Sequence, residues 1–439
     1  MMYKLYYHIT KNASFFLEKL LEKRRDKNKE DPKRYVEKKA IITEKRPDAP
    51  LVWIHAASIG EARSALILIN KIRYEYPDIF FLVTTGTKTS AQIMTKDLPD
   101  NTVHQYYPFD HPIWTKTFIE HWNPDLILWM ESELWPNMLA VIKSKNIPAF
   151  LINARMSPKS YRNWALLKPL TRDMLSTFKK ILCQTKADAQ YYQKLGASDV
   201  SVSGNIKYSA APLAYDTDSL TKTKLALNGR KFWLFASTHD GEEEMACRIH
   251  QILKKTFPEL LTIIVPRHPE RRKEIEEKCK AYTLDVLLRG EDKKLPYDRT
   301  DIYIVDTLGE LGLFYRLADI ACIGRSFSND GGGGHNPIEA AQLECAVLYG
   351  PNVQNLQEIF DEMEQNSAAW KVNSEILLAN AVKELLKEPE KVENFKNTAY
   401  NFSKDKSGTA LGVLDTLRPE IEGIYTKRPI SKANRTIKL

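Results

Sequence analysis

The first 25 residues lack any apolar stretch near the roughly 20 residues that a membrane-spanning helix needs. Charged and amide side chains, Lys11, Asn12 and Glu18 among them, interrupt the first 25 residues, so we do not expect a cleaved signal peptide either. The five cysteines among 439 residues are odd in number and form no C-x-x-C pair, which excludes a disulfide framework and gives no indication of a zinc site. This use of cysteine fits a protein of the reducing cytosol.

Signatures of common nucleotide-binding and nucleic-acid-binding proteins are also missing. No G-x-x-x-x-G-K-S/T loop occurs, and no G-x-G-x-x-G follows the first expected strand, which weakens NTPase and dinucleotide-binding interpretations. The net charge of +8 is concentrated at the ends, because residues 1–46 hold 14 Lys and Arg against 7 Asp and Glu, and residues 427–439 hold five basic residues and no acid. Basic ends around a mildly acidic body argue against a nucleic-acid-binding main surface and indicate that the ends contact something anionic.

The first 25 residues have the pattern of an amphipathic helix. Apolar residues fall on one helical side and lysines on the other, and the basic run KRRDKNK follows; the apolar residues are Leu5, Ile9, Phe16, Leu17, Leu20 and Leu21. Such a helix is typical of segments that lie on an anionic membrane surface. The same pattern also suits a helix packed on the protein's own body, and the sequence alone favours neither.

Short apolar runs alternate with longer amphipathic ones along most of the chain, which indicates βα units and parallel sheets. The expected strands are LVWIHA, IFFLVTT, DLILWM, IPAFLIN and KKILCQ in the first half, and KFWLFAS, LLTIIV, LDVLL, DIYIVD, DIACIG and CAVLYG in the second. We therefore expect an α/β protein with two doubly wound, Rossmann-like domains facing a cleft. The expected parts are a basic amphipathic segment at 1–46, a first α/β domain at 47–208, a linker at 209–229, a second α/β domain at 230–402, and a C-terminal segment with a basic tail at 403–439.

In doubly wound sheets, ligands lie beyond the carboxyl ends of the strands. Polar loops occupy such positions here: ASIGE, MESELWP, GNIKYS, ASTHDGEEE, PRHPERR, DTLGELG and GRSFSNDGGGGHNPIEA. The last loop is the most informative, because its four glycines let backbone N–H groups approach a ligand and Asn336-Pro337 suits a helix start. It has the form of a phosphate or nucleotide cradle, although glycine runs also occur in plain surface loops.

Several charged residues in these loops are candidates for catalysis or ligand binding. Glu61 stands at the start of a helix just after a buried strand, where a carboxylate either complements the helix dipole or acts as a general base. Arg267 lies in the turn Pro266-Arg267-His268-Pro269, from which a guanidinium can bind a phosphate, and Glu310 suits either a ribose contact or a helix start. Asp216-Thr217-Asp218 resembles a D-x-D metal motif, but its place in the polar linker favours helix capping, so we expect no metal.

Two further loops are less distinctive on their own. Glu131 and Glu133 follow a strand two residues apart, and in an extended chain they would point to opposite faces, so that only one could enter the cleft. Lys207 in GNIKYS is a lone cation, for which a plain surface lysine is the default interpretation.

Taken in order, the motifs make the chain resemble the Kdo (3-deoxy-D-manno-oct-2-ulosonic acid) transferases of lipopolysaccharide assembly, from about Asp31 to Asn401. The matching motifs are HAASIGE, MESELWPN, INARMS, GNIKY, ASTHDGEEE, VPRHPER, DTLGELG and GGGGHNPIE. The resemblance implies a GT-B glycosyltransferase that needs no metal or other cofactor and moves Kdo from CMP-Kdo onto lipid A precursor (lipid IVA). It also implies a place at the cytoplasmic face of the inner membrane, held peripherally or by the N-terminus.

The resemblance further assigns roles to residues. It implies that Glu61 is the carboxylate base and that Glu131 and Lys207 stabilise the transition state. The segments that contact CMP in the family match Pro266, Arg267, Leu308, Gly309, Glu310, Asn336, Pro337, Ile338 and Glu339. With these loops considered together, we favour the catalytic role of Glu61 over simple capping.

The sequence departs from these relatives in two places. They usually begin with a strongly apolar membrane segment, whereas this N-terminus is rich in lysine, and their shorter glycine loop is here GRSFSNDGGGGHNP. Since fold alone does not select function, a nucleotide-sugar epimerase or a non-catalytic nucleotide-sugar binding protein is the alternative.

Overall fold

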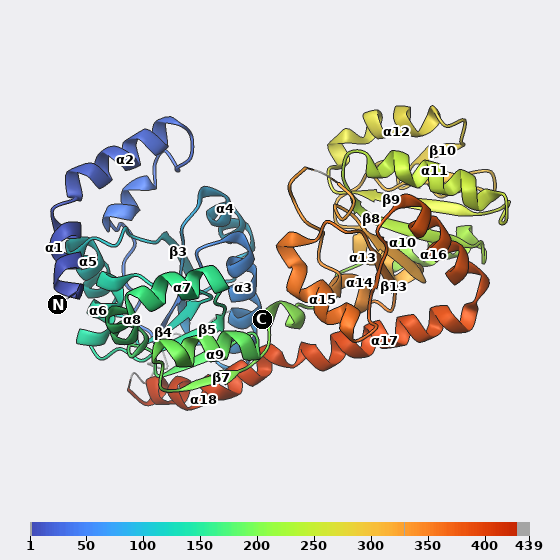
Figure 1. Cartoon of the computed structure of the whole chain (residues 1–439). Helices are drawn as coiled ribbons and strands as arrows, with labels where there is room; N and C mark the ends of the chain where they lie inside the picture. The colour runs from blue at the N-terminus through green and yellow to red at the C-terminus, as the bar shows by residue number, and fades with distance from the viewer. Residues whose placement is uncertain (1, 329, 428–439) are drawn as a thin grey trace. The chain divides into compact units, whose positions relative to one another are not determined.

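The computed structural model describes residues 2–328 and 330–427. The chain forms two compact units (Figure 1): unit 1 contains residues 2–210 and 406–427, and unit 2 contains residues 211–405 apart from residue 329. Each unit is built on a seven-stranded sheet in which the neighbouring strands are parallel. The expectation of two doubly wound α/β units is confirmed.

The sheet of unit 1 has the strand order β3-β2-β1-β4-β5-β6-β7. Its strands are β1 (Leu51–His55), β2 (Phe80–Thr85), β3 (Thr102–Tyr106), β4 (Leu126–Met130), β5 (Ala149–Ala154), β6 (Lys180–Cys183) and β7 (Val200–Val202). The order reverses its direction between β1 and β4, which pair with each other. In a doubly wound sheet a ligand is expected beyond the carboxyl ends of such a strand pair.

Strand β1 illustrates why this sequence forms a buried parallel strand. Leu51 and Trp53 belong to the hydrophobic core on one face of the sheet, whereas Val52 and Ile54 belong to the core on the other face. Because both faces are covered, the strand is a continuous apolar run rather than an alternating one.

The helices of unit 1 are α1 (Met2–Lys11), α2 (Ser14–Asp26), η1 (Tyr35–Lys39), α3 (Ile59–Glu75), α4 (Lys88–Asp97), α5 (Pro112–Trp122), α6 (Pro136–Ser144), α7 (Pro158–Leu166), α8 (Lys168–Leu175), α9 (Lys186–Leu195), η2 (Ile206–Ser209) and α18 (Thr409–Lys427). Several of them, among them α3 and α5, cover the two faces of the sheet, whereas α2 stands away from it (Figure 1). Helix α18 comes from the end of the chain, yet Val413, Leu414 and Leu417 are buried in the same core as Ile69 of α3. The C-terminal helix therefore completes the unit that the N-terminal half begins.

Unit 2 repeats the architecture with the strand order β10-β11-β9-β8-β12-β13-β14. Its strands are β8 (Phe232–Thr238), β9 (Leu261–Pro266), β10 (Val286–Leu288), β11 (Ile302–Ile304), β12 (Ile320–Ile323), β13 (Ala346–Tyr349) and β14 (Trp370–Lys371). Its helices are α10 (Thr217–Leu227), α11 (Glu242–Lys254), η3 (Pro269–Arg271), α12 (Arg272–Lys280), α13 (Leu311–Leu317), α14 (Ile338–Ala341), η4 (Gln354–Leu356), α15 (Gln357–Gln365), α16 (Glu375–Lys387) and α17 (Pro389–Ser407). Here the reversal lies between β8 and β12.

The N-terminal segment forms two helices rather than one. Helix α1 packs one face on unit 1, where the Tyr6 hydroxyl donates to Asp110 Oδ2 at 3.0 Å. Its other face is open, since Leu5 and Ile9 are 64% and 61% exposed. On α2, Phe16 is exposed, whereas Leu21 is buried and does not belong to the open apolar face. Within the described residues, no helix combines the length and the hydrophobicity needed to cross a bilayer.

Candidate active site

Two carboxylates meet at the strand reversal of unit 1. Glu61 lies in the first turn of α3, after β1, and Glu131 directly follows β4. Ser58 caps α3, because its Oγ accepts the Glu61 N–H at 3.3 Å. The Glu61 carboxylate in turn accepts the Ala57 N–H at Oε2 at 2.9 Å. Glu61 therefore has the contacts that its interpretation as a helix-start residue predicted. Its position beside Glu131 is also compatible with the role of a general base.

Glu61 is only 7% exposed. This burial, with the negative charges of Glu131 and Glu133, raises the pKa of Glu61 to about 7. The hydrogen bonds from Ala57 and Ser58 lower it, but burial outweighs them. A carboxylate of this kind changes its protonation near neutral pH, which is the property a general base needs.

Glu131 adopts a left-handed backbone conformation, with φ at +55°. The chain is therefore not extended at this point, and simple alternation does not decide where the two acids of MESELW point. Glu131 Oε1 lies 3.6 Å from Lys207 Nζ and is buried without a hydrogen-bond partner among the described residues. An unsatisfied buried acceptor beside the candidate base suits a donor group such as a substrate hydroxyl.

Glu133 has a different environment from Glu131. Its Oε2 accepts the Trp135 indole N–H at 2.9 Å and lies 3.3 Å from His55 Nε2. Burial alone would raise the pKa of Glu133, but the contacts with His55 and Trp135 lower it. Glu133 therefore remains an ionised carboxylate beside the aromatic core of unit 1.

Lys207 is placed by amide side chains that the sequence analysis did not single out. Asn205 Oδ1 accepts the Lys207 N–H at 3.0 Å, and Asn153 Oδ1 accepts the Ile206 N–H at 3.0 Å. Gln184 links them, since it donates to the Asn153 carbonyl and accepts from the Asn205 amide. In the sequence, Asn153 and Asn205 belong to two separate motifs, INARMS and GNIKY. Nothing in either motif indicates that the two lie in contact, because that contact depends on the tertiary fold.

Lys207 also reaches the start of α3. A Cβ built on Gly60 would lie 3.4 Å from Lys207 Nζ, at the limit of ordinary van der Waals contact. The structure thus brings Glu61, Glu131 and Lys207 together at one end of the sheet of unit 1.

In unit 2, the loops after β8, β9 and β12 form a second cluster. Arg267 follows Pro266 at the end of β9, is exposed, and donates its backbone N–H to the Thr238 carbonyl at 3.0 Å. His239 Nε2 lies 3.1 Å from His335 Nε2, and His239 Nδ1 lies 3.2 Å from Asp330 Oδ2. Arg267, His239 and the glycine loop thus carry hydrogen-bonding groups at the carboxyl end of this sheet.

Both histidines of this cluster are held neutral. Burial, with the nearby positive charges of Arg267 and Arg325, lowers the pKa of His335 to about 3. Burial and Arg325 also lower the pKa of His239. Neutral imidazoles next to Arg267 can bind polar ligand atoms without adding charge.

Glu242 links the loop after β8 to the loop after β12 through hydrogen bonds. It lies in the first turn of α11, is 2% exposed, and accepts the backbone N–H groups of His239 at 2.9 Å, Arg325 at 2.7 Å and Phe327 at 3.0 Å. Burial raises the pKa of Glu242 to about 7 despite these three hydrogen bonds. The GEEE motif therefore holds the loop after β8 against the loop after β12.

The glycine loop is compact rather than open. A Cβ on Gly333 would lie 2.3 Å from the Gln354 backbone nitrogen, and Gly334 has φ at +56°. After the loop, Asn336 Oδ1 accepts the Ile338 N–H at 3.1 Å, and Asn336 Nδ2 donates to Glu339 Oε1 at 3.2 Å. Pro337 stands at the start of the short helix α14. Close packing thus accounts for part of the glycine run.

Glu310 is engaged by protein groups. Both of its oxygens accept from the Arg289 guanidinium, at 2.7 and 2.8 Å, and Thr307 also contacts it. Burial would raise the pKa of Glu310, but Arg289 and Thr307 lower it. Beside it, Leu308 is exposed and Gly309 has φ at +82° with open space around it.

The D-x-D sequence serves as a helix cap. Asp216 Oδ1 accepts the Ser219 N–H at 2.6 Å at the start of α10, which confirms the capping interpretation. Within the part of the chain that the structure describes, no group of three or more His, Cys, Asp or Glu side chains is arranged to hold a metal ion.

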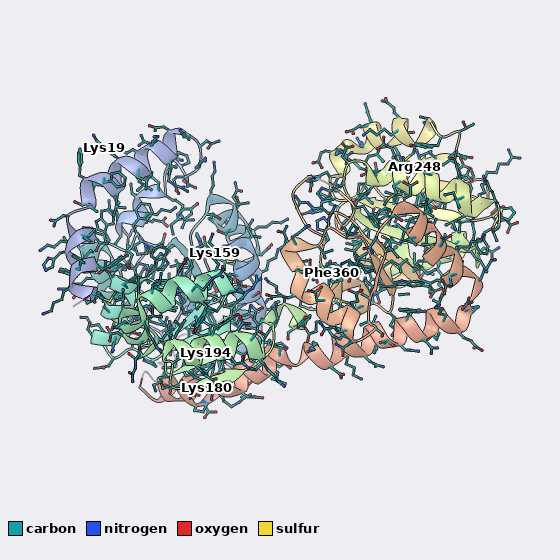
Figure 2. All side chains as sticks on the ribbon, in the orientation of Figure 1. Lys19, Lys159, Lys180, Lys194, Arg248 and Phe360 are labelled. Atoms are coloured by element: carbon teal, nitrogen blue, oxygen red, sulfur yellow. The ribbon has the colours of Figure 1, made fainter. Side chains whose placement is uncertain are left out.

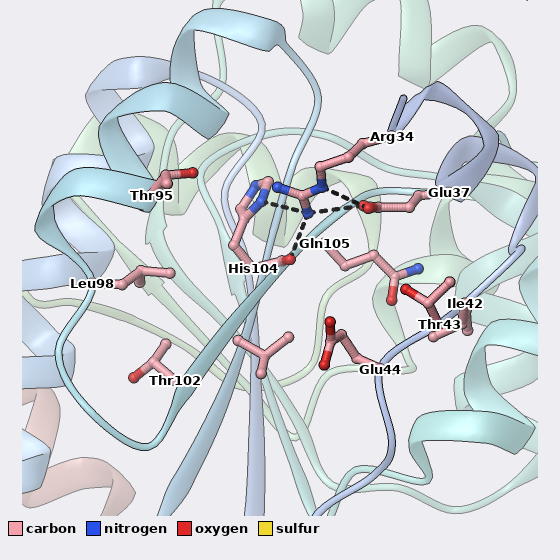
Figure 3. Close-up of a pocket in the computed structure, with 11 residues that line it drawn as sticks. Arg34, Glu37, Ile42, Thr43, Glu44, Thr95, Leu98, Thr102, His104 and Gln105 are labelled. Carbon is pink, nitrogen blue, oxygen red and sulfur yellow. Dashed lines mark hydrogen bonds and ion pairs between the residues drawn. The ribbon is translucent and has the colours of Figure 1, made fainter. Parts of the chain in front are cut away.

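A hollow of about 520 Å³ lies beside β3, the edge strand of unit 1 (Figure 3). Arg34 donates to both oxygens of Glu37, at 2.6 and 3.0 Å, and to the His104 carbonyl at 2.7 Å. Glu37 accepts the Tyr106 N–H at 2.8 Å. This ion pair binds two backbone groups on the free edge of β3, which hinders pairing of the edge with another strand.

Comparisons with known proteins agree with the geometry. Residues 32–210 match the family described as 3-Deoxy-D-manno-octulosonic-acid transferase (kdotransferase). The 3-deoxy-D-manno-octulosonic acid transferase of Rickettsia conorii is 39% identical over 81% of this chain and 76% of its own length. The probable mitochondrial 3-deoxy-D-manno-octulosonic acid transferase of Arabidopsis thaliana is 35% identical over 92% of this chain and 91% of its own length. A solved UDP-GlcNAc 2-epimerase from Neisseria meningitidis matches 84% of this chain and 100% of its own with a TM-score of 0.54 at 14% identity. At this identity the likeness is one of fold alone. The chain therefore belongs to the 3-deoxy-D-manno-octulosonic acid transferase family of glycosyltransferases.

Proposed function

We propose that this protein transfers Kdo from CMP-Kdo onto lipid A precursor (lipid IVA), with Glu61 as the general base and without a metal. Membership of the Kdo transferase family supports the transferred sugar. One observation carries the assignment of the base: Glu61 is buried at the strand reversal of unit 1, beside Glu131. The raised pKa of Glu61, about 7, fits proton transfer at neutral pH.

The reaction requires a base because a sugar hydroxyl is a poor nucleophile. As the hydroxyl oxygen of the acceptor bonds to the anomeric carbon of Kdo, the bond from that carbon to the CMP phosphate oxygen breaks, and ionised Glu61 takes the hydroxyl proton. Such general base catalysis contributes about 10²–10⁴-fold. Glu131 and Lys207, the charged pair beside the base, are assigned to stabilising the charge that develops in the transition state.

We assign binding of the donor to unit 2. The leaving CMP phosphate gains negative charge and needs cations or N–H groups, and the exposed Arg267 and the neighbouring glycine loop offer both. The other segments assigned to CMP are Pro266, Leu308, Gly309, Glu310, Asn336, Pro337, Ile338 and Glu339. Because Arg289 already engages Glu310, we expect Glu310 to act by shaping this loop or by accepting a further hydroxyl with its remaining lone pairs.

We also propose that α1 and α2 hold the protein on the cytoplasmic face of the inner membrane. The support is a set of exposed apolar side chains on these two short helices, followed by a basic flank; the exposed residues are Leu5, Ile9, Phe15, Phe16 and Leu20. Lys19, which lies on the outer side of α2 (Figure 2), has its Nζ 4.4 Å from the centre of the Phe15 ring. A lipid-linked acceptor would then be presented at the surface on which the enzyme rests.

The test is to incubate the purified protein with CMP-Kdo, with and without lipid IVA, in buffer containing EDTA. We expect CMP to be released only when lipid IVA is present, and we expect the mass of the lipid to rise by a whole number of Kdo units. Modification of the donor without an acceptor would indicate the epimerase alternative, and binding of the donor without release of CMP would indicate a binding protein. Either result would overturn the proposal.

A further inference from the structure

A continuous series of contacts begins at helix α2. Arg24, near the end of this helix, donates through Nε to Glu30 Oε1 at 2.6 Å. The other oxygen of Glu30, Oε2, lies 2.6 Å from Lys38 Nζ. Lys38 Nζ also donates to the backbone carbonyl of Gly86 at 3.0 Å. These contacts connect α2, through a buried ion pair, to the loop that follows β2.

The series continues through backbone groups to the candidate base. The Gly86 N–H donates to the Ala57 carbonyl at 3.3 Å, and the Ala57 N–H donates to Glu61 Oε2 at 2.9 Å. A Cβ on Gly86 would lie 3.3 Å from the Ala57 oxygen, so the two loops are in close contact. Only Gly86 and Ala57 therefore separate the Lys38 ammonium from the Glu61 carboxylate.

Lys38 is not an ordinary surface lysine. Its side chain is 4% exposed and that of Glu30 is 1% exposed, and its Nζ lies 5.5 and 5.8 Å from the ring centres of Tyr106 and Phe109. Burial of an ion pair is weak evidence for a role in stability, because desolvation offsets much of the attraction. What this arrangement supplies is a fixed position for one ammonium group.

The segment that carries Lys38 is itself anchored. Just before it in the chain, Arg34 donates to the His104 carbonyl of β3 (Figure 3), and Glu37 accepts the Tyr106 N–H of the same strand. The contacts with β3 thus hold the segment that carries Lys38 in place. The Lys38 ammonium group in turn holds the loop after β2 through the Gly86 carbonyl.

From this geometry we propose that Lys38 is a positioning residue for Glu61, which it acts on through the backbones of Gly86 and Ala57. Arg24 and Glu30 extend the effect to α2, so that the geometry of the base depends on how this helix is seated. The proposal rests on the proposed role of Glu61 as the base. It is a separate claim, because Glu61 can be the base whether or not Lys38 positions it.

The expected consequence is a change in how activity depends on pH. The side chains whose charges lie near Glu61 are Glu131, Glu133 and Lys207, and none of them takes part in the Lys38 contacts. The Ala57 N–H stabilises the ionised form of Glu61, so loosening this bond raises the pKa of Glu61 further. The acid side of the kcat–pH profile should therefore move to higher pH.

The experiment compares Lys38→Met with the double variant Lys38→Met/Glu30→Gln, which removes both buried charges together. We expect kcat at neutral pH to fall about 10-fold in both variants, less than the roughly 10²-fold that a 1 Å misplacement can cost, and the acid side of the profile to move to higher pH. Amide hydrogen exchange in residues 56–61 should become faster, and KM for CMP-Kdo should stay unchanged. Arg24→Gln, at the partly exposed end of the series, should produce a smaller change in the same direction.

Lys231→Met is the matched control. Lys231 Nζ also donates to a backbone carbonyl, that of Leu386 at 2.7 Å, and lies 5.1 Å from the ring centre of Phe257, but it belongs to unit 2. We expect its kcat–pH profile and its exchange in residues 56–61 to match those of the unaltered protein.

The possible outcomes separate the two claims. If Glu61→Gln keeps normal turnover, the role of the base fails, and hydrogen exchange in the Lys38 variants still reports on positioning. If Glu61→Gln is inactive while the folded double variant and Arg24→Gln keep the normal pH profile and exchange, Glu61 remains the base and the role of Lys38 is overturned. Should the Lys38 variants fail to fold, an Arg24→Gln protein with an unchanged profile would likewise overturn it.

Discussion

At the scale of single residues, Glu61 combines a helix-start contact with a raised pKa. We expect Glu61→Gln to lower kcat by at least about 10²-fold while CMP-Kdo affinity stays near normal, because the donor is assigned to other residues. Turnover with lipid IVA, together with calorimetric titration of the donor, would measure both quantities. Near-normal turnover would reduce Glu61 to a helix-start residue.

The same pKa predicts how pH changes stability. A carboxyl group whose pKa is about 7 when folded and 4.5 when unfolded holds more protons in the native state between these values, so its contribution to stability is lost as pH rises from about 4.5 to 7. Glu61→Gln should therefore raise the free energy of unfolding at pH 8, by at most about 3 kcal/mol, with little effect near pH 4.5. Urea unfolding at the two pH values checks this, and equal effects at both would contradict it.

Arg267 gives a prediction for the donor side. Loss of a charge-assisted contact to phosphate typically costs about 1.5–3 kcal/mol, so Arg267→Ala should weaken CMP binding by about 10- to 150-fold. Arg248→Ala provides the control, because Arg248 (Figure 2) is another arginine of unit 2 but pairs with Glu375. If both variants bind CMP with unchanged affinity, Arg267 does not belong to the site.

At the scale of elements, α1 has two different faces, and an experiment must treat them separately. Deleting the helix would uncover the core that Met2 and Tyr3 cover. We instead expect Leu5→Gln/Ile9→Gln/Phe16→Ser to reduce co-sedimentation with anionic vesicles, because each exposed apolar side chain contributes up to about 1.5–3 kcal/mol when buried. High salt should weaken binding further by screening the basic flank.

The control for this experiment is Leu225→Gln, which replaces another strongly exposed leucine, on α10 of unit 2. It should sediment like the unaltered protein. Unchanged sedimentation of the triple variant at low and at high salt would exclude α1 and α2 as the membrane-binding surface.

The elements that the sequence predicted are those with strong apolar runs. All eleven expected strands are present, whereas β3, β7 and β14 were not expected. Strand β3 reads TVHQY, and its buried polar side chains have partners from elsewhere in the chain: the His104 ring contacts Arg34 and Thr85, and Gln105 accepts the Trp122 indole N–H. Helix α10 lies within the stretch 209–229 that the polar composition marked as a linker.

In the candidate site, too, some residues could be predicted from the sequence and others could not. The ordered loop motifs and the family resemblance they carry made Glu61, Glu131 and Lys207 candidates, and the structure places the three side chains together. The positive φ values of Glu131 and Asn153, and the amide contacts through Gln184, depend on neighbouring strands that are distant in the sequence. A motif read on its own therefore could not reveal the residues that hold Lys207.

At the scale of the whole molecule, unit 1 depends on two stretches of chain that unit 2 separates in the sequence. Leu417 of α18 is fully buried against the sheet of unit 1, so Leu417→Ala should destabilise that unit by about 2–5 kcal/mol. Leu411→Ala, on the same helix but at an exposed position, should change stability by less than about 0.5 kcal/mol. Native-state hydrogen exchange of peptides from each unit would show whether the effect is confined to unit 1.

The late return of α18 also bears on how the protein is made. During translation, the core face that packs against α18 remains uncovered until unit 2 and this helix have been synthesised. At about 5–20 residues per second, that interval is on the order of 10–45 s. Unit 2 is continuous in sequence and can fold in the meantime, so the half of the chain that is synthesised first is the half that matures last. A nascent chain of this design exposes an apolar surface to chaperones for about half of its synthesis.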